Sequence, residues 1–269
     1  MTLAYSGSFN GYSFGNGARP GAAVQKLSGF GGTEVEIPTS PRYDDGDVPG
    51  VPRRPGKTVN LELGLIARTQ AELVTLRDYT EQSFVPLPAP SPLVIGTRQM
   101  YVQVLKCDPF RDPSWPGDEK TTPCPIEFLA ADPGVYSSTL HSYDSDALEL
   151  PAGTGFAVPM TNAGTVASRQ GRAYRFTITA VTDCVTPGMV VGDTESVRWT
   201  GLRLTAGQTF RLEHDRSSWV GTQRVDGYAR SAGGTPFLSY PVLDPGANVV
   251  DVGCASGTCH VVVEWRDTW

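Results

Sequence analysis

Apolar and polar residues alternate along much of the first half of the chain. The clearest example is the segment 58–67, TVNLELGLIA, in which the pattern repeats every second residue. Its alternating apolar positions are Val59, Leu61, Leu63 and Leu65. A period of two is typical of a β-strand with one face in the core. Similar segments at 100–107 and 125–138, with short glycine-bounded apolar pieces before residue 40, predict a mainly β first half.

A single segment, 69–84, has the spacing of a helix instead. Thr69 and Glu72 form the T-x-x-E pattern of a capping box at its start. One face then carries, at helical spacing, Leu73, Leu76, Thr80 and Phe84. The proline-rich sequence VPLPAPSP follows and ends the pattern. We therefore predict one α-helix in the first half of the chain.

From about residue 140 onward the pattern indicates no further helix. Residues 141–150 are polar and are predicted to form a linker. Beyond them, short apolar runs recur between turn residues, as in RFTIT at 175–179 and HVVVEW at 260–265. About eight short strands at such spacing are typical of a β-sandwich. The predicted organisation is a first domain over 1–140, the linker, and a second domain over 151–269.

A long polar loop interrupts the strands of the first domain. Residues 41–56, PRYDDGDVPGVPRRPG, are rich in Pro, Gly, Asp and Arg and are not expected to form a helix, a strand or a core. Ordering the backbone of this loop costs on the order of 20 kcal/mol in conformational entropy. Burial of Tyr43, Val48 and Val51 offsets only about 5 kcal/mol of that cost. We predict that a neighbouring molecule is needed to order this loop.

The composition is that of a globular protein with an acidic balance of charge. The 269 residues include 30 Gly and 22 Pro, which favour short strands and turns. A net charge of −6 argues against nucleic-acid binding, which needs a basic face. The sequence shows neither an export signal at its start nor a run of the ~20 apolar residues that a membrane helix needs. We expect synthesis in a cytoplasm and no membrane partner; the excess of Arg over Lys is typical of a GC-rich genome.

Residues with catalytic chemistry are few in this sequence. His214 lies beside Asp215, which suggests a hydrolase, but adjacent residues on a strand point to opposite faces. The nucleophile motif G-x-S-x-G is absent. Asp144, Asp146 and Glu149 resemble the start of a calcium loop but lack its Gly and its final Glu. We predict no catalytic residue, no metal ligand and no cofactor.

Two of the five cysteines are predicted to lie together. Cys254 and Cys259 flank the turn ASGT between two strands, and they are either free thiols or a disulfide pair. A zinc site would need two more ligands there, and only His260 is near. Cys107 and Cys124 are predicted to meet as a second pair, on weaker support from the sequence, and Cys184 is predicted to remain single.

The order of several short motifs resembles a known family. In the first half they are FNGYSFG at 9–15, YDDGDVPGVPRRPGKTVNLELGL at 43–65, a helix ending in F-x-P, and PIEFLAADPGVYSS at 125–138. In the second half they are TNAGTV, RFTIT, LRLTAGQTFRLEHD, LDPGANVVDV and VVVEWRDTW. This succession covers almost the whole chain. It resembles the distal tail protein family of long-tailed phages with non-contractile tails, particularly the minor tail proteins of actinobacterial phages.

The resemblance implies a split β-barrel with one α-helix, followed by a galectin-like β-sandwich. Copies of the first domain are then expected to close into a ring, usually hexameric, at the distal end of the virion tail, after assembly in the bacterial host cytoplasm. Such a ring joins the tail tube protein to the tail-tip and receptor-binding proteins, and DNA crosses its lumen. Neither catalysis nor a cofactor is expected.

A ring also suggests how the polar loop is ordered. Acidic residues on one copy, Asp44, Asp45 and Asp47, are expected to meet basic residues on the next, Arg42, Arg53 or Arg54. Exposed ion pairs contribute only about 0–1 kcal/mol each. Backbone hydrogen bonds and apolar contacts between copies must therefore supply most of the stability of the ring.

The alternative function is that of a carbohydrate-binding adhesin that recognises a host cell-wall saccharide. Sugar-binding β-sandwiches stack saccharide rings on exposed aromatic side chains, and Trp219, in a turn, is the first candidate contact, with Tyr228 the second. A glycoside hydrolase is a weaker third interpretation. It needs two carboxylates about 5–10 Å apart, and the sequence alone places no such pair.

Overall fold

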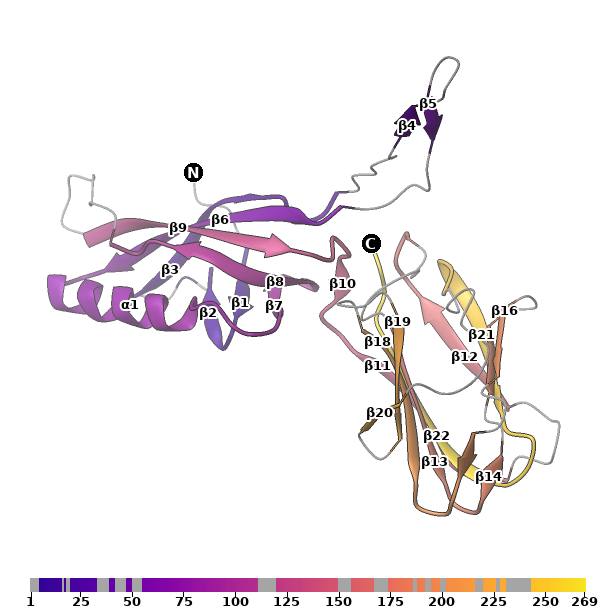
Figure 1. Ribbon diagram of the computed structural model, residues 1–269. Coiled ribbons are helices and arrows are strands. Elements are labelled where there is room, and N and C mark those ends of the chain that lie inside the picture. The colour runs from indigo at the N-terminus through magenta and orange to yellow at the C-terminus, as the bar shows by residue number, and fades with distance from the viewer. Residues whose placement is uncertain are drawn as a thin grey trace. The chain divides into compact units, whose positions relative to one another are not determined.

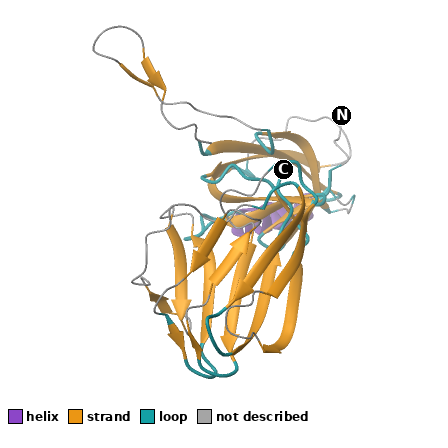
Figure 2. Cartoon of the chain, turned by 90° about the vertical axis from the view of Figure 1, so that its right-hand side faces the viewer, coloured by secondary structure: helices purple, strands orange, loops and turns teal. Residues whose placement is uncertain are grey.

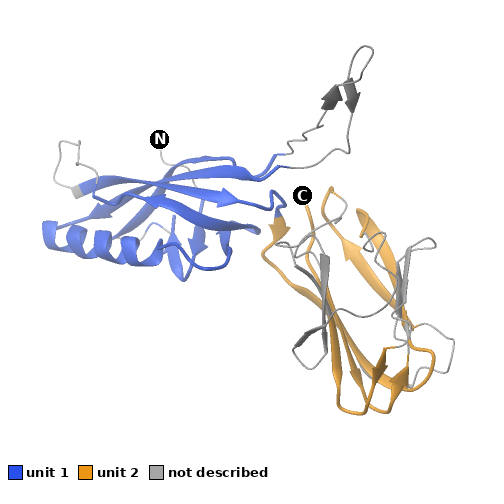
Figure 3. Cartoon of the chain, in the orientation of Figure 1, with its two compact units in different colours: residues 1–135 blue, residues 136–269 orange. Residues whose placement is uncertain are grey.

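In the computed structural model the chain divides between Val135 and Tyr136 into two units, which Figure 3 shows in different colours. We call residues 1–135 unit 1 and residues 136–269 unit 2. The structure describes residues 5–15, 17, 20–32, 39–41, 47–49, 55–110, 120–149, 156–166, 174–185, 188–191, 195–198, 202–215, 220–225, 228–230 and 243–269. Among these residues no helix has both the length and the apolar character needed to cross a bilayer.

Unit 1 is built on one antiparallel sheet (Figure 1). Its strands are β1 (Gly7–Phe9), β2 (Tyr12–Phe14), β3 (Gly21–Ser28), β6 (Lys57–Ala67), β7 (Ser91–Ile95), β8 (Arg98–Cys107) and β9 (Lys120–Ala130). They are hydrogen-bonded in the order β2-β1-β7-β8-β9-β6-β3. The two strands at the ends of this order, β2 and β3, also contact each other. The amide of Gly15 donates a hydrogen bond of 2.7 Å to the carbonyl of Ala22 beside them, so the sheet curves back on itself.

Strand β6 lies between β9 and β3 in this order. It pairs with β9 along its whole length, from Lys57 opposite Ala130 to Ala67 opposite Lys120, and with β3 on its other side. The alternating apolar side chains predicted to face the core are at most 1% exposed, and they are Val59, Leu61, Leu63 and Leu65. The strand predicted from the period of two is confirmed.

The predicted helix is α1 (Gln70–Ser83). Thr69 is its N-cap, and the capping box forms in both directions. The Thr69 hydroxyl accepts from the amide of Glu72 at 3.2 Å, and the Glu72 carboxylate accepts from the amide of Thr69 at 3.1 Å. The helix buries Leu73 and Thr80, and Phe84 follows it into the core. The apolar face read from the sequence therefore points toward the sheet, although Leu76 is only half-buried.

Aromatic rings join the helix to the strands of unit 1. Phe84 stacks on Phe9 with ring centroids 5.2 Å apart, and Phe128 contacts both rings. Tyr12 packs edge-on against Phe84, and its hydroxyl accepts a hydrogen bond of 2.9 Å from Thr80. Burial raises the pKa of Tyr12 to about 12. One cluster of rings thus packs the end of the helix against β1, β2 and β9 in a single core.

The structure contains a strand in the polar loop, where none was expected. Strand β4 (Thr39–Pro41) ends at the first residue of the loop and pairs antiparallel with β5 (Asp47–Pro49) inside it, with Ser40 opposite Val48. They form a two-stranded sheet of their own. The expectation failed because backbone groups pair independently of side-chain burial, so a hairpin needs no apolar pattern. An isolated hairpin of this size is at best marginally stable in water.

Unit 2 consists mainly of two antiparallel sheets (Figure 2). The larger has the order β11-β22-β13-β18-β19-β20, formed by His141–Glu149, Thr258–Trp265, Tyr174–Ala180, Thr209–Asp215, Val220–Val225 and Tyr228–Arg230. The smaller has the order β12-β21-β15-β16, formed by Phe156–Asn162, Gly246–Gly253, Gly188–Val191 and Glu195–Arg198. Two short strands, β14 (Cys184–Val185) and β17 (Arg203–Leu204), pair separately, and β10 (Tyr136–Ser137) opens the unit.

The core of unit 2 lies between the two sheets. Phe176, Ile178 and Val261 from the larger sheet and Val158 and Val250 from the smaller one belong to the same buried cluster. The described residues are mainly β, with one helix in unit 1 and a sandwich in unit 2. The fold class predicted from the sequence is therefore confirmed.

The linker predicted over residues 141–150 is wrong. Residues His141–Glu149 form β11, an edge strand that pairs with β22 from His141 opposite Trp265 to Glu149 opposite Thr258. The register shifts between Asp144 and Ala147, as at a β-bulge. The segment reads as a linker because its side chains are polar, but an edge strand needs only a partner for its backbone.

Candidate functional site

The charged residues predicted to join ring subunits fall mostly outside the described residues. Arg42, Asp44, Asp45, Arg53 and Arg54 are among those that the structure does not describe. Asp47 begins β5, where its backbone lies opposite Pro41. The role of these six residues stays a prediction.

Of the two candidate saccharide contacts, one lies in the part of the chain that the structure describes. Trp219 lies outside the described residues. Tyr228 begins β20 at the edge of the larger sheet of unit 2, where its backbone is opposite Val225. Saccharide binding by the second unit stays a prediction.

Cysteine sulfurs form the densest group of reactive side chains in the described residues. Cys184, Cys254 and Cys259 are buried, and their three Sγ atoms all lie within 4.8 Å of one another. The Sγ atoms of Cys184 and Cys254 are 3.6 Å apart. All three are free thiols, so the structure contains no Cys254–Cys259 disulfide. Cys184, predicted to be a single thiol, is the third member of the group. We call these residues the sulfur cluster.

The three thiols differ in pKa. Hydrogen bonds from the Cys259 and Cys184 thiols lower the pKa of Cys254 to about 6. Burial, followed by the contact with Cys254, raises the pKa of Cys184 to about 12. The hydrogen bond to Cys254 and burial together raise the pKa of Cys259. Of the three thiols, Cys254 therefore loses its proton most readily.

Backbone contacts bring the three cysteines together from distant parts of the sequence. Cys184 lies in β14, whereas Cys254 and Cys259 flank the turn between β21 and β22. Val185 exchanges two backbone hydrogen bonds with that turn: its amide donates to Ser256 at 3.2 Å and its carbonyl accepts from Ala255 at 2.8 Å. Gly257 has a φ of +109°, and a Cβ there would lie 2.3 Å from the carbonyl oxygen of Asp183. Only glycine permits so close an approach of the two segments.

The weaker cysteine pair predicted in unit 1 also lies close in space. The Sγ atoms of Cys107 and Cys124 are 3.8 Å apart, and both are free thiols. The two residues belong to β8 and β9, which pair antiparallel, with Cys107 opposite Ile126. The pairing of these strands places the two thiols close together, as predicted for this pair.

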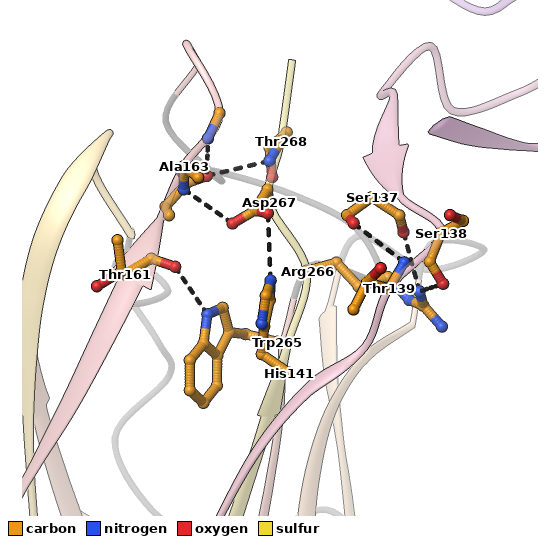
Figure 4. A network of polar contacts seen from close by, with 12 residues as sticks. Ser137, Ser138, Thr139, His141, Thr161, Ala163, Trp265, Arg266, Asp267 and Thr268 are labelled. Atoms are coloured by element: carbon orange, nitrogen blue, oxygen red, sulfur yellow. Dashed lines mark hydrogen bonds and ion pairs between the residues drawn. The ribbon is translucent and has the colours of Figure 1, made fainter. Parts of the chain in front are cut away.

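A polar network holds the last residues of the chain in unit 2 (Figure 4). The carboxylate of Asp267, a buried residue, accepts from the amide of Ala163 at 2.8 Å, and its second oxygen lies 3.2 Å from Nε2 of His141. The indole of Trp265 donates to the carbonyl of Thr161 at 2.9 Å, and Arg266 donates to the carbonyls of Ser137 and Ser138. This network ties the chain end to the end of β12 and to the segment that leads into β11.

Asn162 completes the network from the smaller sheet. Its side-chain oxygen accepts from the amides of Thr268 and Gly164, each at 3.1 Å. Its amide nitrogen donates to the carbonyl of Leu243 at 3.3 Å. Every polar atom of this buried side chain therefore has a partner, which makes the arrangement a structural clamp.

The histidines described with side chains are each engaged by a carboxylate. His141 contacts Asp267, as above, and its ring stacks on Trp265 with centroids 5.4 Å apart. His260 contacts Asp144 across the β11–β22 pair. Asp144, one of the residues that resembled a calcium loop, is thus paired with a histidine.

Comparison with known proteins finds similarity in fold alone. No family model matches the chain, and no curated protein matches it in sequence. Among solved structures, the fold is that of phage tail hub and baseplate proteins. The SPP1 Dit (gp 19.1) protein, described as a paradigm of the hub adsorption apparatus in phages that infect Gram-positive bacteria, has a TM-score of 0.59 at 11% identity, covering 99% of this chain and 100% of that one.

Two further structures extend the likeness. A chain from the phage P2 baseplate in its activated conformation with Ca matches with a TM-score of 0.51 at 8% identity, covering 98% of both chains. A chain from the same baseplate with Sr matches with a TM-score of 0.50 at 9% identity, covering 97% of both. The likeness runs through both units, so the predicted succession of a helix-bearing β unit and a β-sandwich is the architecture of these proteins as well.

Proposed function

We propose that this protein is a structural component of a phage virion that forms a ring at the distal end of a long non-contractile tail. The ring, a hexamer, connects the tail tube to the tail-tip and receptor-binding proteins, and DNA passes through its lumen. The observation that carries the proposal is the end-to-end likeness to the SPP1 Dit hub protein, with 99% of this chain and 100% of that chain covered. The excess of Arg over Lys is in keeping with a phage of a GC-rich, actinobacterial host.

The β4–β5 hairpin supports assembly between copies. It is a two-stranded sheet with no third strand among the described residues, and an isolated hairpin of this kind is marginal in water. A strand edge of an adjoining subunit supplies the hydrogen bonds that this hairpin lacks, by strand addition. The flanking Asp and Arg side chains then select the neighbour by charge, since exposed ion pairs add specificity more than affinity.

Exposed apolar side chains of unit 1 support the same arrangement. Tyr79 on α1 is 53% exposed, Leu105 on β8 is 53% exposed, and Phe110 is 50% exposed. Burial of apolar surface contributes about 25 cal/mol per Å². Contacts through unit 1 between neighbouring copies therefore provide the stability that exposed ion pairs do not.

Charge reversal in the loop tests the proposed subunit contact. We expect wild-type protein to form rings in light scattering and electron microscopy, and Arg53→Glu/Arg54→Glu to need about tenfold higher concentration for the same fraction of rings, equivalent to about 1.4 kcal/mol. The matched control is Arg203→Glu, an exposed arginine of unit 2, which should assemble as the wild type does. Phage carrying the double variant should incorporate less of the protein into tails.

The two possible failures have different meanings. Unaltered assembly of Arg53→Glu/Arg54→Glu would contradict the charge pairing and leave the ring intact. A wild-type protein that stays monomeric at all concentrations, and that is absent from the tube–tip junction of purified virions, would contradict the ring itself.

A further inference from the structure

The sulfur cluster joins three separate segments at one end of unit 2. Cys184 lies in β14, Cys254 directly follows β21, and Cys259 lies at the start of β22. All three are at most 5% exposed. Two cysteines can be explained as a disulfide pair, but a third sulfur in contact with both leaves one thiol over in any such pairing.

The distances within the cluster are those of a metal centre. With metal–sulfur bonds of about 2.3 Å, tetrahedral geometry places ligand sulfurs about 3.8 Å apart. The Cys184 and Cys254 sulfurs are 3.6 Å apart, and no pair in the cluster exceeds 4.8 Å. Changes of at most about 1 Å in the sulfur–sulfur distances therefore suffice to direct all three thiols at one ion.

We propose that Cys184, Cys254 and Cys259 bind one thiophilic d10 metal ion, Zn²⁺ or Cu⁺, through three thiolates. Soft thiolate ligands select these ions over Mg²⁺ or Ca²⁺. Among the described residues no His, Asp or Glu joins the three sulfurs. A small exogenous ligand such as water therefore completes a tetrahedral Zn²⁺ site, whereas Cu⁺ takes the three sulfurs alone. All three sulfurs bind as thiolates, so Zn²⁺ yields a complex of charge −1 and Cu⁺ one of charge −2.

The backbone holds the three ligands in place without the ion. The amides of Val181 and Thr182 donate to the carbonyl of Thr258 at 2.8 and 3.1 Å, and the amide of Thr258 donates to the Thr182 hydroxyl at 2.8 Å. These bonds fix the segment before Cys184 against Thr258, the residue before Cys259. Because the segments are already docked, metal binding does not need to order a loop, and its free energy stabilises unit 2.

The role of the ion is that of a cross-link. Cys184 and Cys254 are 70 positions apart in sequence, so an ion between them closes a long segment of chain. Closure of a long loop restricts the unfolded chain more than closure of a short one. Under the proposed function the protein is assembled in a bacterial cytoplasm, where disulfides are rare, and the site then takes the place of a disulfide.

Metal titration of the full-length protein tests the site. The reduced protein is titrated separately with Zn²⁺ and with Cu⁺, and bound metal is measured after gel filtration. We expect one equivalent of at least one of these ions, sulfur-only protein ligation in the X-ray absorption spectrum, and a rise in Tm of about 5–10 °C at 100-fold excess over Kd.

Two sets of variants locate the binding. Cys254→Ser should bind the ion at least tenfold more weakly, whereas Cys107→Ser/Cys124→Ser, which removes the two thiols of unit 1, should bind as the wild type does. Cys254→Ala keeps the site apolar, and it replaces Cys254→Ser in this experiment if the serine variant does not fold. Retention of full binding by Cys254→Ser or Cys254→Ala would overturn the proposal, and so would a folded wild-type protein that takes up neither ion. In the latter case the cluster is a set of buried thiols that pack as small apolar residues.

Discussion

The two units of this protein close their cores in different ways. Unit 1 has one curved sheet and one helix, and its core combines buried aliphatic side chains of the strands with a group of aromatic rings in which Phe84 stacks on Phe9. Unit 2 has two sheets whose apolar faces meet over a cluster of mostly aliphatic side chains. Its two ends are held by other means. The sulfur cluster lies at the start of β22, and the network around Asp267 lies just beyond its end.

This difference has a consequence for stability. In unit 1 a few large rings make contacts with the helix and with several strands at once, so the loss of one ring opens a cavity shared by many elements. In unit 2 the apolar contacts are spread over many side chains, and the polar groups at the ends are costly to leave unpaired. Single substitutions should therefore have their largest effect in the aromatic cluster, a smaller one in the polar network and the smallest at an exposed cap.

The largest effect is expected for Phe84→Ala. Phe84 is 2% exposed and contacts Phe9, Tyr12 and Phe128. Removing a buried ring should cost about 3–5 kcal/mol, measured by chemical denaturation of the full chain followed by circular dichroism. Val85→Ala, at a neighbouring side chain that is 41% exposed, is the control and should change stability by less than about 0.5 kcal/mol. Equal effects of the two variants would show that the aromatic cluster is not the anchor of α1.

A smaller effect is expected for Asp267→Ala in unit 2. This change leaves the amide of Ala163 and the ring of His141 without their acceptor. A buried donor that loses its partner costs about 1–3 kcal/mol, measured in the same denaturation experiment. Asp267→Asn keeps one carbonyl oxygen as the acceptor for the Ala163 amide, so this variant should lose less stability than Asp267→Ala. If both variants lost the same stability, the hydrogen bond to Ala163 would not be the reason.

The smallest effect is expected for Thr69→Ala at the start of α1. The variant removes the acceptor for the amide of Glu72, and loss of such a cap costs about 1 kcal/mol. Thr75→Ala is a matched control, because Thr75 is exposed and its hydroxyl contacts only the carbonyl of Ala71 in the same helix. In thermal unfolding, the Tm of Thr69→Ala should lie a few degrees below that of Thr75→Ala. A loss as large for Thr75→Ala would assign the effect to the threonine side chain in general.

Features that depend on neighbouring residues could be predicted from the sequence. The alternation in 58–67 identified β6, because the two faces of a strand meet different surroundings. Thr69 and Glu72 marked the start of α1, because the capping box closes within a few residues. The turn between Cys254 and Cys259 likewise brought two thiols together across a hairpin.

Features that depend on a distant partner could not be predicted. Residues 141–149 look like a linker, and they become a strand only because β22 offers its edge. The paired strands β4 and β5 lack any apolar pattern that would reveal them. Cys184 shows no local sign that it belongs with two cysteines 70 or more positions away.

The sequence by itself therefore determined the types of its best-patterned elements, the order of the two kinds of unit and the likeness to phage distal tail proteins, since all of these lie in local spacing and in the order of motifs. The tertiary structure alone decided which edges pair, how the chain end is held by Asp267, and that a third sulfur joins Cys254 and Cys259. The physical reason is that backbone hydrogen bonds and side-chain contacts between remote segments depend on the path of the whole chain. No local pattern records that path.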